Sequence, residues 1–136
     1  MSLLKNLRKK IIWMEIGSAP MKKIHKTKLL NLFPKKKIII HYGLTEASRS
    51  TMLHLKKIYN KNELVGKPSP GVKISICDEN RKIIQKRNII GEIVVDGQNV
   101  AKGYFNYKSN NFENNRFYTG DLGSIDKNGY IYFHGR

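Results

Sequence analysis

The first third of the chain has the pattern strand, helix, strand, and that order leaves few folds open. Residues 11–16 and 38–42 are short β-prone runs, each followed by glycine. Between them, apolar residues recur mainly every three to five positions from residue 21 to 33, which predicts an amphipathic helix that Pro34 ends. This pattern favours two parallel strands with a helix that covers one face of the sheet.

Parallel strands predict a ligand site at their carboxyl ends, because ligands bind at that edge of an open α/β sheet. In this chain the two ends are Gly-Ser-Ala-Pro at residues 17–20 and Tyr-Gly-Leu-Thr-Glu at residues 42–46. We therefore expect these two segments to carry the candidate site.

After about residue 60 the pattern changes to short alternating strands separated by Gly, Pro and Asn. Strands are predicted at Val72–Cys77 and Gly91–Asp96, and a hairpin is predicted from Gly123–Asp126 with Tyr130–His134. The Asp-Lys-Asn-Gly sequence between the hairpin strands suits a tight turn, because Asn and Gly tolerate positive φ angles. This half is expected to be antiparallel or barrel-like.

The expected fold class is therefore α/β, with a strand–helix–strand remnant of a parallel sheet before a smaller antiparallel, barrel-like subdomain. We place the division at residues 1–60 and 61–136. A chain of 136 residues suits one modest domain and is short for a multidomain enzyme complete in itself.

The charge of the chain raises a second hypothesis. The sequence has 26 Lys and Arg against 10 Asp and Glu, a net charge of +16, and the excess is greatest in the first 40 residues. Such a face suits RNA or anionic lipid, so a small basic binding module using Lys5–Lys37 is one interpretation. A compositional bias toward Lys, Ile and Asn explains the charge without any partner, and we expect no nucleic-acid partner.

Cysteine content and hydropathy bear on the compartment. Cys77 is the only cysteine, which excludes an internal disulfide framework and favours a reducing compartment such as the cytoplasm. The partly apolar run after the basic first ten residues is interrupted by Glu15, so a signal peptide is not expected. No stretch approaches the ~18 apolar residues of a membrane-spanning helix, so no integral membrane segment is expected.

The segment 42–46 places groups suited to a nucleotide within five residues. The Tyr42 ring can stack on a base, the Thr45 hydroxyl can donate to a phosphate oxygen, and the Glu46 carboxylate can hold magnesium. The alternative is a plain strand end, with Thr45 or Glu46 capping a helix over Ala47–Leu55.

A second candidate cluster lies near the C-terminal end of the sequence. Asp121 precedes the predicted hairpin and Arg136 follows it, so the hairpin brings them together. Asp121 can accept hydrogen bonds from a ribose diol, and Arg136 can pair with a phosphate or sugar oxygen. The alternative is that Asp121 caps a turn and Arg136 is a frayed terminus.

Six short blocks together resemble the adenylate-forming superfamily, which includes the acyl-CoA synthetases. Their order and approximate spacing match the family from about Ile11 onward. The blocks are Gly17–Pro20, Tyr42–Glu46, Val65–Pro68 with Pro70-Gly71, Gly91–Ile93 with Gly103-Tyr104, Tyr118–Asp121, and Gly135-Arg136.

The resemblance implies a reaction. Such enzymes join a carboxylic acid to ATP, release pyrophosphate, and pass the acyl group from the adenylate to a thiol. The implied cofactors are ATP or AMP, Mg²⁺, and coenzyme A or a carrier-protein thiol. The implied partners are a nucleotide, a small carboxylic acid, and a carrier protein or a complementing fragment.

The resemblance also implies roles for residues of the first two blocks. Tyr42, with Gly43 beside it, would stack on adenine, while Gly17, Ser18, Ala19 and Pro20 would line the adenine and acyl pocket. Thr45 would contact the phosphate, and Glu46 would bind magnesium, so these two form the candidate catalytic pair.

At the other end, the resemblance implies that Asp121 holds the ribose hydroxyls. Arg136 would contact ribose or phosphate just before a hinge. The family's Gly-, Ser/Thr- and Lys-rich phosphate loop and its small C-terminal domain with a reactive lysine do not occur in these residues.

The resulting interpretation is part of an AMP-forming acyl-CoA synthetase, inactive as this fragment. Hydrophobic or fatty acids are favoured because residues 47–53 offer no acidic partner for a substrate amine. Activation of an amino acid or aryl acid for a carrier protein remains the alternative within the same fold.

Overall fold

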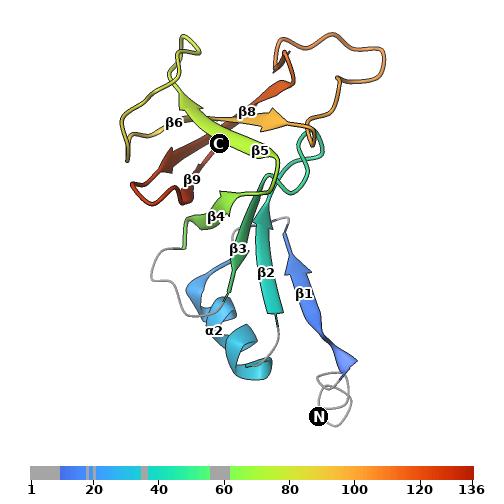
Figure 1. Cartoon of the computed structure of the whole chain (residues 1–136), viewed down its shortest axis with the longest axis vertical. Helices are drawn as coiled ribbons and strands as arrows, with labels where there is room; N and C mark the ends of the chain where they lie inside the picture. Colours follow the sequence, from blue (N-terminus) through green and yellow to red (C-terminus); the bar gives the residue numbers. More distant parts are fainter. Residues whose placement is uncertain (1–9, 18, 20, 35–36, 56–61) are drawn as a thin grey trace.

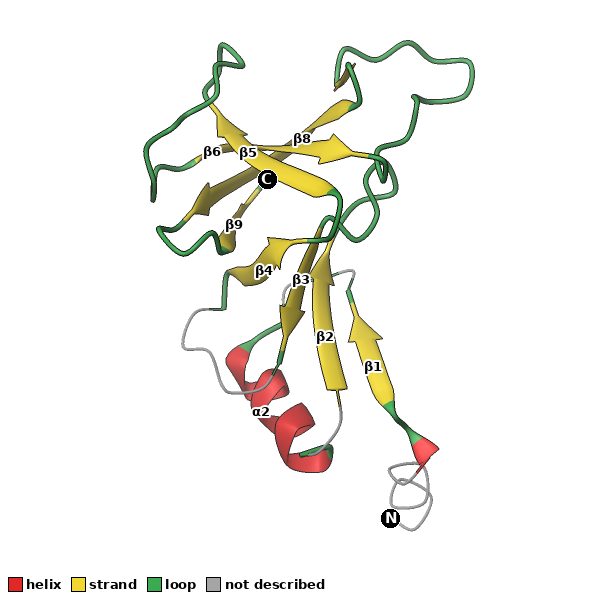
Figure 2. Cartoon of the chain, in the orientation of Figure 1, coloured by secondary structure: helices red, strands yellow, loops and turns green. Residues whose placement is uncertain are grey.

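The computed structural model describes residues 10–17, 19, 21–34, 37–55 and 62–136, and its elements are mostly strands (Figures 1 and 2). In chain order they are β1 (Trp13–Ile16), α2 (Lys23–Leu32), β2 (Lys37–Tyr42), β3 (Thr51–His54), β4 (Leu64–Pro68), β5 (Val72–Cys77), β6 (Gly91–Gly97), β7 (Phe112–Glu113), β8 (Arg116–Ile125) and β9 (Ile131–Gly135).

The strands form one mixed sheet in the order β1-β2-β3-β4-β9-β8-β6-β5, with β7 paired to β8. β1 and β2 are parallel, which confirms the prediction from the strand–helix–strand pattern. The other strand pairs are antiparallel, including the predicted β8–β9 hairpin. The described strands follow an open path from β1 to β5, so the expected barrel-like closure is not confirmed.

Figure 1 shows β1, β2, β3 and α2 in one half of the molecule and β5, β6, β8 and β9 in the other. The long strands of the second half cross the direction of β1–β3 steeply in this view (Figure 2). Strand β4 joins the halves, because it pairs with β3 on one side and β9 on the other. The carboxyl end of β2 therefore points into the region between the two halves.

Strand β2 also contributes to two of the hydrophobic clusters. Ile38 and Ile40 are buried against α2, whereas Tyr42 packs against the cluster built on Ile93 and Phe117. Alternate residues of a strand share one face, which explains why these three side chains lie on the same side of β2. The packing thus fixes the direction in which Tyr42 leaves the strand.

The helix suggested for Ala47–Leu55 is wrong. Residues 51–54 form strand β3, which pairs with β2 and β4, and Ala47 forms an isolated bridge with Val100. Thr51 and Leu53 are buried while His54 is exposed, an alternation typical of a strand. The Thr51 hydroxyl donates to the Val65 carbonyl at 2.7 Å, which further ties β3 to β4.

Cys77 is a buried free thiol. Its Sγ lies 3.9 Å from a carboxylate oxygen of Glu92. Burial, aided by the negative charge of Glu92, raises the pKa of Cys77 to about 11, so the thiol stays protonated near neutral pH.

Among the described residues, no helix is long and apolar enough to cross a membrane.

The helix α2 contains an unusual buried residue, Lys26. Only 1% of its surface is exposed, and its Nζ donates to the Asn62 carbonyl at 3.4 Å. Burial lowers the pKa of Lys26 below its usual value, and the charge of Glu63 partly opposes this shift. The folded chain therefore binds this proton less tightly than the unfolded chain, and the charged lysine destabilises the fold at neutral pH.

We expect Lys26→Met to raise the free energy of unfolding at pH 7 by about 1 kcal/mol or more, because methionine removes a buried charge at similar length. This advantage should shrink as the pH rises toward the ordinary lysine pKa of 10.5. Urea unfolding at pH 7 and pH 10 measures both effects. Lys28→Met, at an exposed position of the same helix, is the matched control. A less stable Lys26→Met would show that the bond to Asn62 outweighs the burial penalty.

Candidate functional site

A β-bulge in β8 sets the direction of Asp121. Glu92 pairs with Leu122 and Val94 with Tyr118, so residues 119–121 of β8 lie opposite the single residue Ile93 of β6. Gly120, at the centre of the bulge, has φ +69°, a conformation that glycine adopts without strain. Bulges re-aim side chains, and this one turns Asp121 toward the end of β2.

The bulge has its own hydrogen bonds. The Thr119 hydroxyl donates to the Ile93 carbonyl at 2.8 Å and accepts from the Asp121 amide at 3.1 Å. The Gly120 amide donates to a Glu92 carboxylate oxygen at 2.8 Å. Because the backbone is held on both sides of Gly120, the position of the Asp121 carboxylate is well defined.

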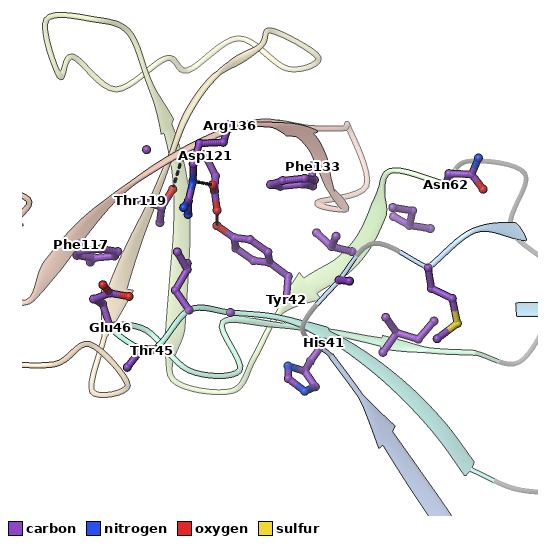
Figure 3. Close-up of a pocket in the computed structure, with 18 of the residues that line it drawn as sticks. His41, Tyr42, Thr45, Glu46, Asn62, Phe117, Thr119, Asp121, Phe133 and Arg136 are labelled. Carbon is purple, nitrogen blue, oxygen red and sulfur yellow. Dashed lines mark hydrogen bonds and ion pairs between the residues drawn. The ribbon is translucent and has the colours of Figure 1, made fainter. Parts of the chain in front are cut away.

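Asp121 joins the two candidate clusters of the sequence. Its side chain is buried, and its two oxygens accept from the Tyr42 hydroxyl and from Arg136 Nε, each at 2.8 Å (Figure 3). The Asp121–Arg136 contact confirms that the hairpin brings its two ends together. Arg136 itself is largely exposed, with 70% of its side-chain surface accessible. The hydrogen bond to Asp121 raises the pKa of Arg136 above its already high usual value.

The Tyr42 hydroxyl stays protonated and donates its hydrogen bond to Asp121. Burial is the main reason that the pKa of Tyr42 lies far above its usual value, and the hydrogen bond to Asp121 adds to the shift. The Tyr42 ring lies 6.0 Å from the Phe133 ring, measured between centroids, at an interplanar angle of 38°. Figure 3 shows both rings beside the Asp121 cluster, so an apolar surface adjoins the buried carboxylate.

The loop after β2 is tight, and Gly43 permits it. A Cβ on Gly43 would lie 2.5 Å from the Arg49 amide nitrogen and 2.9 Å from the Ala47 carbonyl oxygen, closer than real Cβ atoms approach backbone. Leu44 and Ala47 exchange backbone hydrogen bonds of 3.1 and 3.2 Å across the loop. The turn therefore presents residues 45 and 46 on its outer side.

Thr45 and Glu46 both line the cavity beside Asp121, with Thr45 exposed and Glu46 half-buried (Figure 3). Glu46 Oε1 accepts a short hydrogen bond from the Tyr104 hydroxyl. A single carboxylate fits the way proteins bind Mg²⁺, whose remaining ligands are phosphates and waters. The described residues contain no group of three or more metal-binding side chains, so a metal here would depend on the nucleotide for most of its ligands.

The Gly-Ser-Ala-Pro segment is only partly described. Ala19 lines the cavity, whereas Ser18 and Pro20 lie outside the described residues. Gly17 lies against His41, and a Cβ on Gly17 would come within 2.2 Å of the imidazole Cε1. Figure 3 shows His41 pointing away from Tyr42, so the close approach of Gly17 lies on the other side of β2.

These groups surround one cavity of about 850 Å³. Its wall combines the loop after β2, the bulge of β8 and the end of β9. The lining residues include Ala19, Tyr42, Gly43, Thr45, Glu46, Tyr104, Thr119, Gly120, Asp121, Phe133 and Arg136. The volume is in the range of small-molecule sites, and a charged cluster beside two aromatic rings can bind a ligand with both polar and flat apolar parts.

Seven of the ten site residues from the sequence lie at this cavity: Ala19, Tyr42, Gly43, Thr45, Glu46, Asp121 and Arg136. Sequence reasoning missed Phe133 and assigned no role to Tyr104. A signal existed for Tyr104, because the Gly103-Tyr104 pair is one of the blocks behind the family resemblance. Phe133 carries no comparable signal, since it resembles any apolar strand residue.

The sequence and the fold are similar to those of known proteins. The family model described as "AMP-binding enzyme" matches residues 2–105. The chain is 36% identical over 121 residues to a 2-succinylbenzoate–CoA ligase of Oceanobacillus iheyensis, covering 85% of this chain and 23% of the relative. A long-chain-fatty-acid–CoA ligase of Bacillus subtilis is 34% identical, over 71% of this chain and 18% of its own length.

A D-alanine–D-alanyl carrier protein ligase of Lactococcus lactis is 32% identical, over 80% of this chain and 22% of its own length. Among solved structures, the O-succinylbenzoate coenzyme A synthetase of Bacillus subtilis in complex with AMP superposes with a TM-score of 0.78. It is 27% identical, over 99% of this chain and 30% of its own.

The fold is that of part of an adenylate-forming enzyme. The chain belongs to the AMP-binding enzyme family, that is, to the adenylate-forming superfamily. It spans about a fifth of the length of the curated relatives described above.

Proposed function

We propose that the chain supplies the nucleotide-binding part of an AMP-forming acid–thiol ligase of the acyl-CoA synthetase type. In this proposal Asp121 binds the ribose hydroxyls and Arg136 a ribose or phosphate oxygen. Tyr42 and Phe133 contact adenine, with Gly43 and the segment 17–20 beside it. The observation that carries the proposal is the buried Asp121 carboxylate at the cavity wall, held between Tyr42 and Arg136.

Each carboxylate oxygen of Asp121 accepts one hydrogen bond from the described residues and retains a lone pair for a ribose hydroxyl. Thr45 and Glu46 lie next to this cluster, where a phosphate attached to the ribose would extend. Glu46 would hold Mg²⁺, which, when bound, neutralises phosphate charge. Arg136 would add positive charge against the negative charge that develops during adenylation.

The domain assignment is part of the proposal. Residues 1–60 would end the AMP-binding α/β subdomain, and residues 61–136 would form the β-rich subdomain that leads to the hinge. The helix α2 and the parallel pair β1–β2 precede residue 60, whereas the described strands after it pair antiparallel, and this change supports the division. A cytoplasmic location is also proposed, because a single buried thiol needs no oxidising compartment.

The acid is proposed to be a fatty or other hydrophobic acid, and the thiol that of coenzyme A. The similarity to a fatty-acid–CoA ligase supports this choice. A second candidate is amino-acid or aryl-acid activation for a carrier protein, which the similarity to a D-alanyl carrier protein ligase favours. A complementing polypeptide is a further proposed partner.

Titration calorimetry with AMP and with 2′,3′-dideoxy-AMP tests the nucleotide site. We expect saturable binding of AMP. The dideoxy analogue should bind at least about tenfold more weakly than AMP, because Asp121 loses its two hydroxyl donors. Repeating the titration between 50 and 200 mM salt separates this site from the basic-module hypothesis, since RNA bound through lysines loses affinity steeply with salt. Absence of AMP binding, or equal affinity for both nucleotides, would contradict the proposal.

A further inference from the structure

The loop between β6 and β7 holds the loop that carries Glu46. The Ala101 amide donates to the Glu46 carbonyl at 2.8 Å, and Val100 forms a β-bridge with Ala47. Asn99 Nδ2 donates to the Ser48 carbonyl at 3.0 Å. These contacts join residues about fifty positions apart and fix the backbone on which the Glu46 side chain stands.

The same loop also reaches the Glu46 side chain. The Tyr104 hydroxyl donates a hydrogen bond to Glu46 Oε1. Glu46 Oε1 is thereby engaged as an acceptor, and the carboxylate is held in one orientation.

A row of aromatic rings anchors Tyr104. Its ring meets Phe112 edge to face, with centroids 5.2 Å apart and an interplanar angle of 82°. The ring centroids of Phe112 and Phe117 lie 4.8 Å apart. Phe117 is 3% exposed and belongs to the core cluster of the second half. The Tyr104 hydroxyl is thus placed by packing, although Tyr104 itself is partly exposed.

We propose that Tyr104 is a positioning residue that orients the Glu46 carboxylate toward a nucleotide-bound divalent cation. The inference rests on the proposed function, in which Glu46 binds magnesium. A carboxylate on an exposed loop samples several rotamers, and each must be given up when a metal binds. The Tyr104 hydrogen bond removes part of that cost in advance, as partners of metal ligands do in known metal sites.

The test compares wild type with Tyr104→Phe, which deletes the hydroxyl and keeps the ring. Affinity is measured by calorimetry for AMP without metal, and for ATP with and without Mg²⁺. We expect AMP affinity within about twofold of wild type, because the variant retains the ribose cluster. The gain in ATP affinity on adding Mg²⁺ should fall about tenfold, the usual scale for loss of such a partner.

Tyr107→Phe is the matched control, because Tyr107 is 69% exposed and contacts the Tyr104 ring at a centroid distance of 6.0 Å. It should leave the Mg²⁺-dependent gain unchanged. An undiminished gain in Tyr104→Phe would overturn the inference, and so would equal losses for AMP and for ATP with Mg²⁺, which indicate a structural role. If wild type binds neither nucleotide, the proposed function fails and the positioning role fails with it. If wild type binds AMP but gains nothing from Mg²⁺, the positioning role alone is overturned.

Discussion

Replacing Asp121 by alanine is expected to lower both the stability of the chain and its affinity for AMP. Asp121 is 4% exposed and accepts hydrogen bonds from Tyr42 and Arg136. Truncation leaves the half-buried Tyr42 hydroxyl without this acceptor, and an unpaired donor costs up to about 1–3 kcal/mol where water cannot replace its partner. Arg136 contributes less to the loss, because its largely exposed guanidinium is readily hydrated.

The effect on AMP is expected to be larger still. The ribose loses both acceptor oxygens of the carboxylate, and the Tyr42 ring loses the bond that fixes it beside Phe133. We expect AMP affinity to fall by about 100-fold or more, from two lost hydrogen bonds at 1–2 kcal/mol each. Urea unfolding and calorimetry on the same preparation measure the two effects.

Asp121→Asn separates stability from ligand binding. The amide has the shape of the carboxylate: its oxygen can accept from Arg136 Nε, and its NH₂ group can donate to the Tyr42 hydroxyl oxygen, which then acts as the acceptor. Stability should therefore fall by less than in the alanine variant. AMP affinity should still drop, because the amide nitrogen cannot accept a ribose hydroxyl. Unchanged AMP affinity in both variants, with the fold intact, would exclude Asp121 from the nucleotide site.

Local patterns predicted the fold where neighbouring residues determine the structure. The helix α2, the parallel pair β1–β2 and the β8–β9 hairpin each follow from a short periodic run, a terminating proline or a tight turn. Strand β3 was missed because its local sequence is compatible with a helix. Its extended form depends on pairing with β2 and β4, and those contacts are not visible in the run itself.

The candidate site shows the same limit. The hairpin predicted the Asp121–Arg136 contact, whose partners are 15 residues apart. The Tyr42–Asp121 and Tyr104–Glu46 bonds join residues 79 and 58 positions apart, and no spacing rule connects them. The bulge that aims Asp121 depends on a register shift against β6, which a single strand cannot indicate. At the level of sequence, only the family resemblance connects these blocks to one site.

The largest effect that we predict is the absence of catalytic activity in this 136-residue polypeptide. We expect no acid-dependent exchange of pyrophosphate into ATP above background, for any carboxylic acid tried. Adenylation needs cationic protein groups that contact the leaving pyrophosphate and the reacting carboxylate, in addition to the metal at Glu46. The family resemblance attributes the first to a phosphate loop and the second to a lysine, and these residues contain neither motif.

The cations at the described cavity wall do not replace these groups. Arg136 Nε is bonded to Asp121, and Lys26 is buried on α2 with its Nζ on the Asn62 carbonyl. Losing one electrostatic group commonly costs about 10²–10³ in rate, so losing two should cost about 10⁴–10⁶. That deficit takes a typical turnover of about 10 s⁻¹ to a level that an exchange assay does not resolve.

Binding and exchange must be measured on the same preparation for this result to be informative. Retained affinity for AMP would show that the polypeptide is folded, so that absent exchange reports missing catalytic groups. Glu46→Ala identifies contamination, because exchange from a trace of another enzyme persists in that variant. Exchange above background that Glu46→Ala abolishes would show that these residues suffice for adenylation, and that groups already at the cavity stabilise the leaving pyrophosphate.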